Sequence, residues 1–591
     1  MPAPLIPATL HLHDGVPYSE AFADVYHSTD GGPAQARHVF LGGNEVERRW
    51  AGRERFVILE TGFGFGLNFL ATWQAFRGQP GKLHYVAVEK HPFSLQDLRT
   101  LHARYPEFES LAAELHSHWP PLVSGGHRAE LSGNVVLTLF FEDIKIVRDL
   151  RLAADAFYLD GFSPAKNPDM WSPALMRSLS RLAAPGATAA TWSVATPVRH
   201  ALEVSGWEVE KREGFGHKKE MLSARIRKGN ESSRARDRRA TVIGAGLAGA
   251  AICERLCARG WEVTLHERHT EPAAEASGNH AGAFHPVATP DDSVFARLTR
   301  AGFLYALKKW PSLEGVRWDA CGALQLARAE TEDISQRKSA EGQPIDYLQY
   351  VDREQASRHA GVSLAAGGLW FPQGGWVQPR SLVRAQLAAC GRNLKTIYSD
   401  EKKSLDGEGI VILANSSDAP TLHPVPHLRL RRVRGQLTYI PEDRIEAPHV
   451  VVLRGGMVLP PVDGLCVVGA SFDLEDDDPE PRAASQAGNL ERLQSILTLD
   501  LKDEAFENRV AFRSVAPDRL PVVGKISDNV HGAFAYGSRG LVWAALAAEL
   551  LASELEGEPL PLEGKLADAL SPQRFARRAL RRSAGSPASL P

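Results

Sequence analysis

The chain has few cysteines and no long hydrophobic segment, and these two absences exclude several classes of protein. Its 591 residues include five cysteines, an odd number and too few for a disulfide framework. No apolar run reaches the roughly 18 residues of a membrane-spanning helix, and residues 1–7 lack the basic and apolar regions of a secretory signal. We therefore expect a cytoplasmic protein with no membrane partner, and nothing indicates an obligate protein partner.

Clusters of metal-ligating residues are also lacking. Cys253 and Cys257 stand four residues apart in a predicted helix. A metal or redox pair is one interpretation, but small buried helix side chains are the interpretation we favour. We predict no metal site.

An excess of charge of one sign is missing as well. The formal net charge is −3, so any surface for nucleic acid has to be local. Arginine clusters occur at residues 429–434 and 574–582, and a basic hairpin tip that could meet phosphate is predicted at residues 215–219. We interpret the first cluster as a solvated face and the second equally as a frayed tail or an RNA contact.

What is present is a globular composition, with 43% hydrophobic and 24% charged residues, in a chain too long for one ordinary domain. Residues 229–239 are polar and charged and predict a linker. The segments on either side, residues 1–228 and 240–591, each contain an apolar strand followed by a glycine-rich turn. We predict two α/β nucleotide-binding domains in series.

The first glycine-rich turn follows a predicted buried strand at residues 56–60 and reads E-x-G-x-G-x-G. Glycines let the backbone approach a ligand closely, although a plain strand-to-helix turn is the alternative for this motif alone. The pattern resembles the class I S-adenosylmethionine methyltransferases. Two later strands also end in acids, which could hold the ribose and the adenine. The predicted donor-site residues are Glu60, Gly62, Gly64, Gly66, Glu89 and Asp143.

A fourth predicted strand ends at Asp160 and leads into a proline-stiffened loop at residues 161–171. α/β sheets place their ligands at such strand ends. An amine must be neutral to attack a methyl sulfonium, and its reference pKa is near 10. Asp160 is therefore our candidate to accept or orient the proton of an amine substrate; capping of the next turn is the alternative.

The second glycine-rich turn is a complete G-x-G-x-x-G between a strand and a helix, formed by Gly244, Gly246 and Gly249. Glu267 ends the next strand, at the spacing expected for a ribose-binding acid. The strand, the turn, the helix and the acid together predict a dinucleotide-binding site.

Later motifs favour FAD over NAD. A small-residue loop (Ser277, Gly278, Asn279) could pass close to a bulky ring, and a motif containing Gly537 and Gly540 opens a predicted helix to Leu555. Its N-terminus could stabilise negative charge on a reduced flavin, and no cysteine is present there for a covalent link. The arrangement resembles the glycine oxidase and D-amino-acid oxidase group, which implies an α+β substrate insert.

Substrates of such flavoenzymes often carry a carboxylate, whose usual partner is a bidentate arginine. Arg513 and Arg539 are our candidates, and a structural ion pair is the alternative for each. Two rival functions also stay open: a small-molecule amine or amino acid oxidase fused to an N-methyltransferase, and a non-catalytic protein with two relic nucleotide folds.

Together the two halves resemble the bifunctional tRNA 5-methylaminomethyl-2-thiouridine biosynthesis family, MnmC. The resemblance rests on residues 22–28, 39–44 and 160–171, and on the flavin half from Gly244 through the Gly537 motif. It implies a tRNA partner modified at the anticodon wobble uridine. The flavin half would remove the carboxymethyl group from 5-carboxymethylaminomethyl-2-thiouridine, and the methyltransferase half would then methylate the resulting primary amine.

Overall fold

The computed structural model describes residues 5–230, 237–405, 409–497, 501 and 504–584. The described residues pack as two compact units, one formed by residues 5–230 with 553–564 and the other by those within 237–552 together with 565–584. Part of the predicted linker, residues 231–236, lies outside the described residues. Within the described part, no helix is long and apolar enough to cross a membrane.

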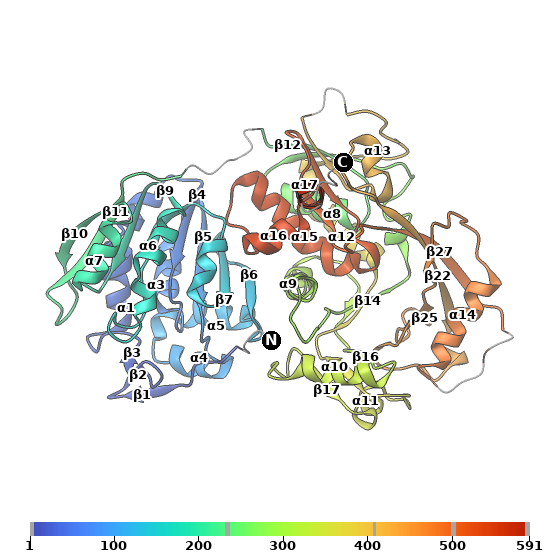
Figure 1. The fold of residues 1–591 in the computed structure, drawn as a ribbon, viewed down its shortest axis with the longest axis horizontal. Helices are drawn as coiled ribbons and strands as arrows, with labels where there is room; N and C mark the ends of the chain where they lie inside the picture. Colours follow the sequence, from blue (N-terminus) through green and yellow to red (C-terminus); the bar gives the residue numbers. More distant parts are fainter. Residues whose placement is uncertain (1–4, 231–236, 406–408, 498–500, 502–503, 585–591) are drawn as a thin grey trace, which may run out of the picture. The chain divides into compact units, whose positions relative to one another are not determined.

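The N-terminal unit is built on an eight-stranded sheet with strand order β10-β11-β9-β8-β4-β5-β7-β6 (Figure 1). Its five central strands are parallel, and antiparallel strands close both edges. The parallel strands are β4 (Arg55–Glu60), β5 (Lys82–Glu89), β7 (Val135–Phe141), β8 (Ala154–Tyr158) and β9 (Ala183–Thr191). The edges are the predicted hairpin, β10 (Trp207–Glu213) and β11 (Glu220–Ile226), and β6 (Gly125–Leu131).

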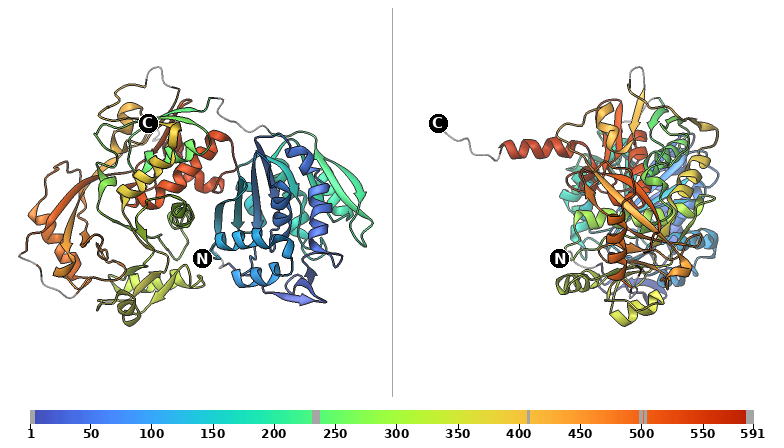
Figure 2. Two further views of the ribbon diagram at one scale, coloured as in Figure 1. Left: turned by 180° about the vertical axis from the view of Figure 1, so that it is seen from behind. Right: turned by 90° about the vertical axis from the view of Figure 1, so that its right-hand side faces the viewer.

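The side chains of the central strands point alternately to the two faces of this sheet, and a hydrophobic core lies on each face. On β4, Phe56 and Ile58 belong to one core, while Val57 and Leu59 belong to the other, because successive strand side chains point to opposite faces. Helices therefore lie on both faces, as opposite views show (Figures 1 and 2). They are α3 (Leu67–Phe76), α4 (Leu95–His102) and α5 (Glu109–His118) on the first, and α6 (Pro173–Ser180) and α7 (Thr196–Glu203) on the second.

The C-terminal unit contains a six-stranded nucleotide-binding sheet with strand order β20-β13-β12-β21-β29-β28. The predicted helix after Gly540 is present as α15 (Gly540–Glu556), and α8 (Leu247–Cys257) follows the G-x-G-x-x-G turn. The strands are β12 (Arg239–Ile243), β13 (Glu262–His266), β20 (Leu394–Ile397), β21 (Ile410–Leu413), β28 (Val522–Lys525) and β29 (Val530–Phe534).

A large insert leaves this sheet in two stretches, one between β13 and β20 and the other between β21 and β28. Its main sheet has nine strands, with long antiparallel partners β22 (Arg431–Pro441) and β27 (Glu507–Val515). Its helices include α9 (Val294–Lys309), α10 (Glu330–Ala340), α11 (Arg353–Ala360), α12 (Pro379–Ala389) and α14 (Ala483–Gln494). A methyltransferase-type α/β unit followed by a nucleotide-binding unit with an α+β insert matches the predicted fold class.

One arginine of each basic cluster is buried. The interpretation as a solvated face is therefore wrong for Arg434, and the interpretations as a frayed tail or an RNA contact are wrong for Arg574. The side chain of Arg434 is 0% exposed, and Arg574 is buried against Asp518, with Nε 2.9 Å from Oδ2. Charge alone predicts that both side chains are exposed, because a run of arginines does not show which of them has a partner inside the protein.

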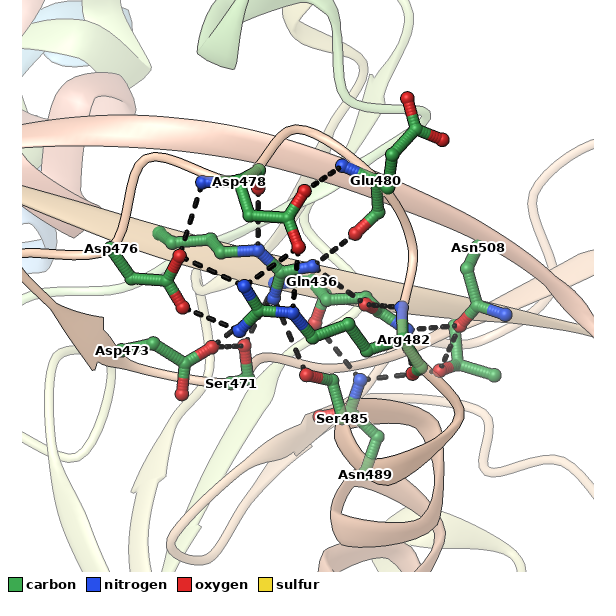
Figure 3. A network of polar contacts seen from close by, with 12 residues as sticks. Gln436, Ser471, Asp473, Asp476, Asp478, Glu480, Arg482, Ser485, Asn489 and Asn508 are labelled. Carbon is green, nitrogen blue, oxygen red and sulfur yellow. Dashed lines mark hydrogen bonds and ion pairs between the residues drawn. The ribbon is translucent and has the colours of Figure 1, made fainter.

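A polar network ties the loop after β26 (Asp473–Leu474) to β22, and Figure 3 labels Asp476, Asp478 and Arg482 of this loop. Arg434 of β22 organises the network. Its guanidinium donates to the carbonyl oxygens of Asp478 and Glu480, at 2.8 and 2.5 Å, and lies 3.2 Å from Asp473 Oδ2. Arg482 closes the same loop through Asp476 and Asp478. Strand alternation points Arg434 away from the face where Gly435 lies.

Replacing Arg434 with methionine should lower the free energy of unfolding of the C-terminal unit by about 3 kcal/mol, because buried acceptors lose their charged donor. Urea unfolding followed by flavin fluorescence measures this loss. The matched control is Arg432→Met on the same strand, whose exposed ion pair with Asp477 is worth at most about 1 kcal/mol. Equal losses in the two variants would contradict the structural role of Arg434.

Candidate active sites

A cavity of about 860 Å³ opens at the carboxyl edge of the eight-stranded sheet. Gly62 and Gly64 line it. Gly64 has φ +55°, and a Cβ on Gly62 would lie 3.2 Å from the carbonyl oxygen of Asp160. The turn therefore needs glycine both for its backbone conformation and for its close approach to the neighbouring strand end.

Glu89 and Asp143 also line this cavity, as predicted, from the ends of two neighbouring strands. Glu89 accepts hydrogen bonds from the backbone N–H groups of Gly64 and His91, both at 2.7 Å. Asp143 lies 3.1 Å from the ammonium group of Lys90. The first acid is rigid and tied to the glycine-rich turn, whereas the second stands at the rim.

Glu60 does not line the cavity, nor does Gly66. The Glu60 side chain is fully buried and accepts hydrogen bonds from Asn68 Nδ2 at 2.7 Å and from the Tyr85 hydroxyl at 2.9 Å. Burial, and then repulsion from Asp160, raise the pKa of Glu60 well above its usual range. Its contacts are with the protein interior rather than with the open space.

Asn68 is a site residue that the sequence reasoning missed. Its amide nitrogen bridges two carboxylates, Glu60 Oε1 at 2.7 Å and Asp160 Oδ2 at 2.8 Å. It stands in the first turn of α3, directly after the glycines. Its position next to the glycine-rich turn could have indicated a place near the site, but the sequence alone does not show which groups a single amide in a helix contacts.

Asp160 lines the cavity and is held from several sides. Oδ1 accepts a hydrogen bond from the backbone of Gly161 at 2.8 Å, and Oδ2 accepts the one from Asn68. Burial raises the pKa of Asp160 to about 6. A fixed carboxylate with a pKa near neutrality is well suited to take a proton from an amine.

Residues 22–28 form one wall of the same cavity. Phe22 stacks on Phe162 with ring centroids 4.6 Å apart, and Tyr26 meets Phe162 edge-on at 5.2 Å. Tyr26 also covers Gly64, where an added Cβ would lie 3.4 Å from its ring. This N-terminal segment thereby joins the donor turn to the loop that follows Asp160.

A second cavity, of about 500 Å³, lies in the C-terminal unit along the G-x-G-x-x-G turn. Gly244 has φ +102°, and a Cβ there would lie 2.8 Å from the carbonyl oxygen of Ala414. Gly249 allows close packing of helix on strand, since its Cβ would lie 1.8 Å from the carbonyl oxygen of Gly244. Gly246 lines the cavity and faces Ser277, whose hydroxyl accepts from the Leu247 N–H at 3.0 Å.

Glu267 lines this cavity and accepts hydrogen bonds from the backbone of Ala245 at 2.8 Å and His269 at 2.9 Å. Gly278 does not line it. A Cβ on Gly278 would lie 2.3 Å from the carbonyl oxygen of Ala273, so its role here is packing of the loop.

Several buried polar groups face this cavity without a partner among the described residues. Such groups are costly unless they are hydrogen-bonded. They fit a large ligand with many polar groups, as FAD is. These atoms are Asn279 Oδ1, Asn415 Oδ1, Ser514 Oγ and the Tyr536 hydroxyl.

Arg513 and Arg539 line the same cavity, beside Gly537 and Gly540. The side chain of Arg513 forms no hydrogen bond or ion pair with any residue in the described ranges, and burial lowers its pKa. Its guanidinium lies against Gly435 of β22, where a Cβ would approach it to 2.8 Å. A half-buried guanidinium that has no partner within the described part of the chain can bind an anionic group.

Arg539 lies beside His285, which the sequence reasoning missed. Arg539 Nη1 donates to the His285 carbonyl oxygen at 3.4 Å, and burial lowers the pKa of Arg539 to about 10. Burial, and then the charge of Arg539, lower the pKa of His285 to about 3. The imidazole is therefore neutral, with Nδ1 2.8 Å from the carbonyl oxygen of Pro286.

The thiols of Cys253 and Cys257 are free and buried in α8, in agreement with our favoured interpretation. Among the residues that the structure describes, no group of three or more His, Cys, Asp or Glu side chains could hold a metal ion.

The variant Gly249→Ala should weaken FAD binding by about tenfold or more, because the added methyl group forces the turn to move at a cost of about 1.4 kcal/mol or more. FAD content and FAD titration measure the effect, and S-adenosylmethionine binding should be unchanged. Gly488→Ala in α14 is the control, since its Cβ would meet only the end of the Arg492 side chain. Full FAD affinity in Gly249→Ala would overturn this assignment.

Comparison with known proteins identifies both halves. Residues 239–554 match the family model "FAD dependent oxidoreductase", and residues 106–227 match "S-adenosyl-L-methionine-dependent methyltransferase". These matches confirm the predicted cofactors, FAD and S-adenosylmethionine. A glycine oxidase structure from Geobacillus kaustophilus aligns with a TM-score of 0.48 and 18% identity, over 57% of this chain and 99% of that one.

Full-length relatives carry both halves in one chain. A protein from Azoarcus sp. (strain BH72) is 46% identical, over 98% of this chain and 99% of its own. A second, from Paraburkholderia phytofirmans, is 44% identical, over 99% and 100%. Both are named tRNA 5-methylaminomethyl-2-thiouridine biosynthesis bifunctional protein MnmC. Two catalytic units joined in this order, matched over their whole length, place this chain in the MnmC family of bifunctional proteins.

Proposed function

We propose that this chain modifies the wobble uridine of tRNA in two steps. The C-terminal unit converts 5-carboxymethylaminomethyl-2-thiouridine into 5-aminomethyl-2-thiouridine, and the N-terminal unit methylates the new amine to give 5-methylaminomethyl-2-thiouridine. The proposal rests on one residue in each cavity: Arg513 lines the second cavity with a guanidinium that has no side-chain partner among the described residues, and Asp160 lines the first with a carboxyl whose pKa is raised to about 6. The name of the full-length relatives, which refers to biosynthesis of 5-methylaminomethyl-2-thiouridine in tRNA, supports this product, and our proposal includes tRNA as the partner and the cytoplasm as the location.

In the oxidising site, Arg513 binds the carboxylate of the carboxymethyl group in a bidentate manner, and Arg539 adds positive charge beside it. FAD bound here would supply the acceptor for the hydride that leaves the carbon between the carboxylate and the amine nitrogen, while the proton on the nitrogen leaves to water. That carbon and the nitrogen become an imine, water adds to it, and the C–N bond breaks. The products are glyoxylate and a primary amine on the uridine.

Several residues of this unit would hold FAD. Glu267 accepts hydrogen bonds from the ribose hydroxyls, and Gly246 lets the pyrophosphate reach the N-terminus of α8. Asn279 and Tyr536 provide partners for the polar edges of the ring system. The turn at Gly537–Gly540 places the N-terminus of α15 toward negative charge.

In the methylating site, Glu89 would hold the ribose of S-adenosylmethionine, Asp143 the adenine, and the turn at Gly62–Gly64 the methionine end. The bound donor supplies an electrophilic methyl group on a sulfonium. Asp160 takes the proton of the attacking amine, a new N–C bond forms, and the S–C bond breaks. Asn68 and, behind it, Glu60 keep Asp160 in place.

The phosphates of tRNA would meet exposed arginines rather than Arg434 or Arg574, which are buried. Arg429 and Arg431, at the start of β22, and Arg581, in α17 (Gln573–Ala584), remain exposed. Each phosphate contact adds salt-dependent affinity without reading sequence.

The decisive experiment uses tRNA carrying the carboxymethylaminomethyl group and mass spectrometry of its nucleosides, with and without S-adenosylmethionine. We expect loss of the carboxymethyl mass without the donor and gain of one methyl group with it. Arg513→Met should stop the first change and leave methylation of aminomethyl-tRNA intact. Unchanged tRNA with FAD bound, together with oxidation of free glycine derivatives, would replace the proposal by the small-molecule alternative.

The raised pKa of Asp160 also predicts how methylation depends on pH. Since its pKa in the folded protein is raised to about 6, the carboxyl is protonated below that pH and can no longer accept a proton. We expect kcat/KM for aminomethyl-tRNA to fall about tenfold per pH unit below about pH 6. Asp160→Asn should lose this limb and be slower by about 10²–10⁴-fold at pH 8; an unaltered limb in this variant would assign it to another group.

A further inference from the structure

One amine of the chain itself lies inside the methylating cavity. The ammonium group of Lys218 stands 3.4 Å from the centre of the Trp192 ring, and both residues line the cavity together with Asp24 and Asp160. Lys218 comes from the turn between β10 and β11, which the sequence marked as a basic tip. The other lysine of this tip, Lys219, is exposed and does not line the cavity.

We propose that Trp192, Asp24 and Asp160 form the subsite that recognises the ammonium group of the acceptor, and that Lys218 occupies this subsite until RNA binds. The inference rests on the proposed function, because the acceptor there is an aminomethyl group. A lysine side chain ends in the same chemical group, –CH2–NH3⁺. The chain therefore supplies its own stand-in for the substrate amine.

The Trp192 ring provides the attraction for a cation. A ring face within about 6 Å of an ammonium group attracts it through the ring quadrupole, and the effect grows as water is excluded. Trp192 is held edge-on by buried Trp171, with centroids 6.3 Å apart, and Trp171 is fixed by its Nε1 bond to the Phe162 carbonyl oxygen at 2.9 Å. The indole N–H group of Trp192 also acts on Asp160, where it opposes the burial that raises the pKa of this carboxyl.

The carboxylates complete the subsite. Lys218 is attracted electrostatically to Asp24 and Asp160, although burial lowers its pKa. Asp24 is held in place by the backbone N–H of Ser163, which donates to its Oδ2 at 2.9 Å, while Lys166 lies 3.5 Å from its Oδ1. An ammonium group at this point faces a ring and two carboxylates, one of which is our proton acceptor.

Only one of the two amines can occupy this place, so Lys218 competes with the substrate. The lysine side chain has a flexible stem of four carbons, so its ammonium group can leave the cavity while the backbone of the turn stays in place. The turn itself is anchored by His217, whose Nδ1 lies 2.8 Å from Asp30 Oδ2. Removal of the Lys218 charge should therefore favour substrate binding rather than weaken it.

The test is steady-state methylation of aminomethyl-tRNA by the full chain with FAD and S-adenosylmethionine. Lys218→Met should lower KM by about 2- to 30-fold, the range that corresponds to a cation–π contact, with kcat little changed. Lys219→Met, the adjacent control, should match the wild-type protein. An unchanged or raised KM in Lys218→Met would overturn the proposal, and a raised one would make Lys218 an RNA contact.

Substitutions of Trp192 separate its ring from its N–H group. Trp192→Phe keeps a ring face and should hold KM within about twofold while lowering kcat, whereas Trp192→Leu should raise KM about tenfold. Equal KM values in the two variants would contradict a cation subsite. Each variant must bind S-adenosylmethionine as the wild type does. Failure of the wild-type protein to methylate aminomethyl-tRNA would refute the proposed function instead, since the subsite is tested only by differences between variants.

Discussion

Burial of the parallel strands on both faces is the constraint on which both sites depend. Helices cover each face of the eight-stranded sheet, so polar groups can reach ligands only where strands end. Asp160 and Glu89 stand at such ends, and Glu267 does so in the second sheet. Glycine-rich turns beside these acids let a ligand approach the backbone. The same edge position thus explains why two unrelated cofactors can be held by similar strand–turn–helix units.

Desolvation then sets the chemistry of the groups at these edges. Burial moves the pKa of Asp160 up to about 6, which suits a proton acceptor, and moves the pKa of Arg539 down to about 10, where the group still carries its charge. An amine connects the two reactions: oxidation produces the primary amine that methylation consumes. In our interpretation, each site recognises a different part of one substituent, the carboxylate at Arg513 and the ammonium group at Trp192.

The reactive groups are held in place by particular buried side chains behind them. Asn68 links Asp160 to the fully buried Glu60, so an acid that looks like a ligand contact in the sequence serves the interior instead. Arg434 similarly ties a loop to β22, the strand whose Gly435 makes room for Arg513. In both cases an ionisable residue lies inside the protein with hydrogen-bond partners, and removal of one partner would leave a buried polar group unsatisfied.

The sequence by itself determined the two nucleotide-binding units, their order and the strand-end acids, because glycine turns and apolar strands are local patterns that survive any packing. It also indicated Asp160, Arg513 and Arg539 as candidates. Only the tertiary structure decided which side chains line a cavity. In the structure, Glu60 contacts the protein interior instead of the cavity, and Arg434 is buried. Asp24, Trp192 and Lys218 line the same cavity. Those three residues lie far apart along the chain, and no local pattern encodes their meeting. Side-chain direction at such distances follows from how strands and loops pack, which a single sequence does not reveal.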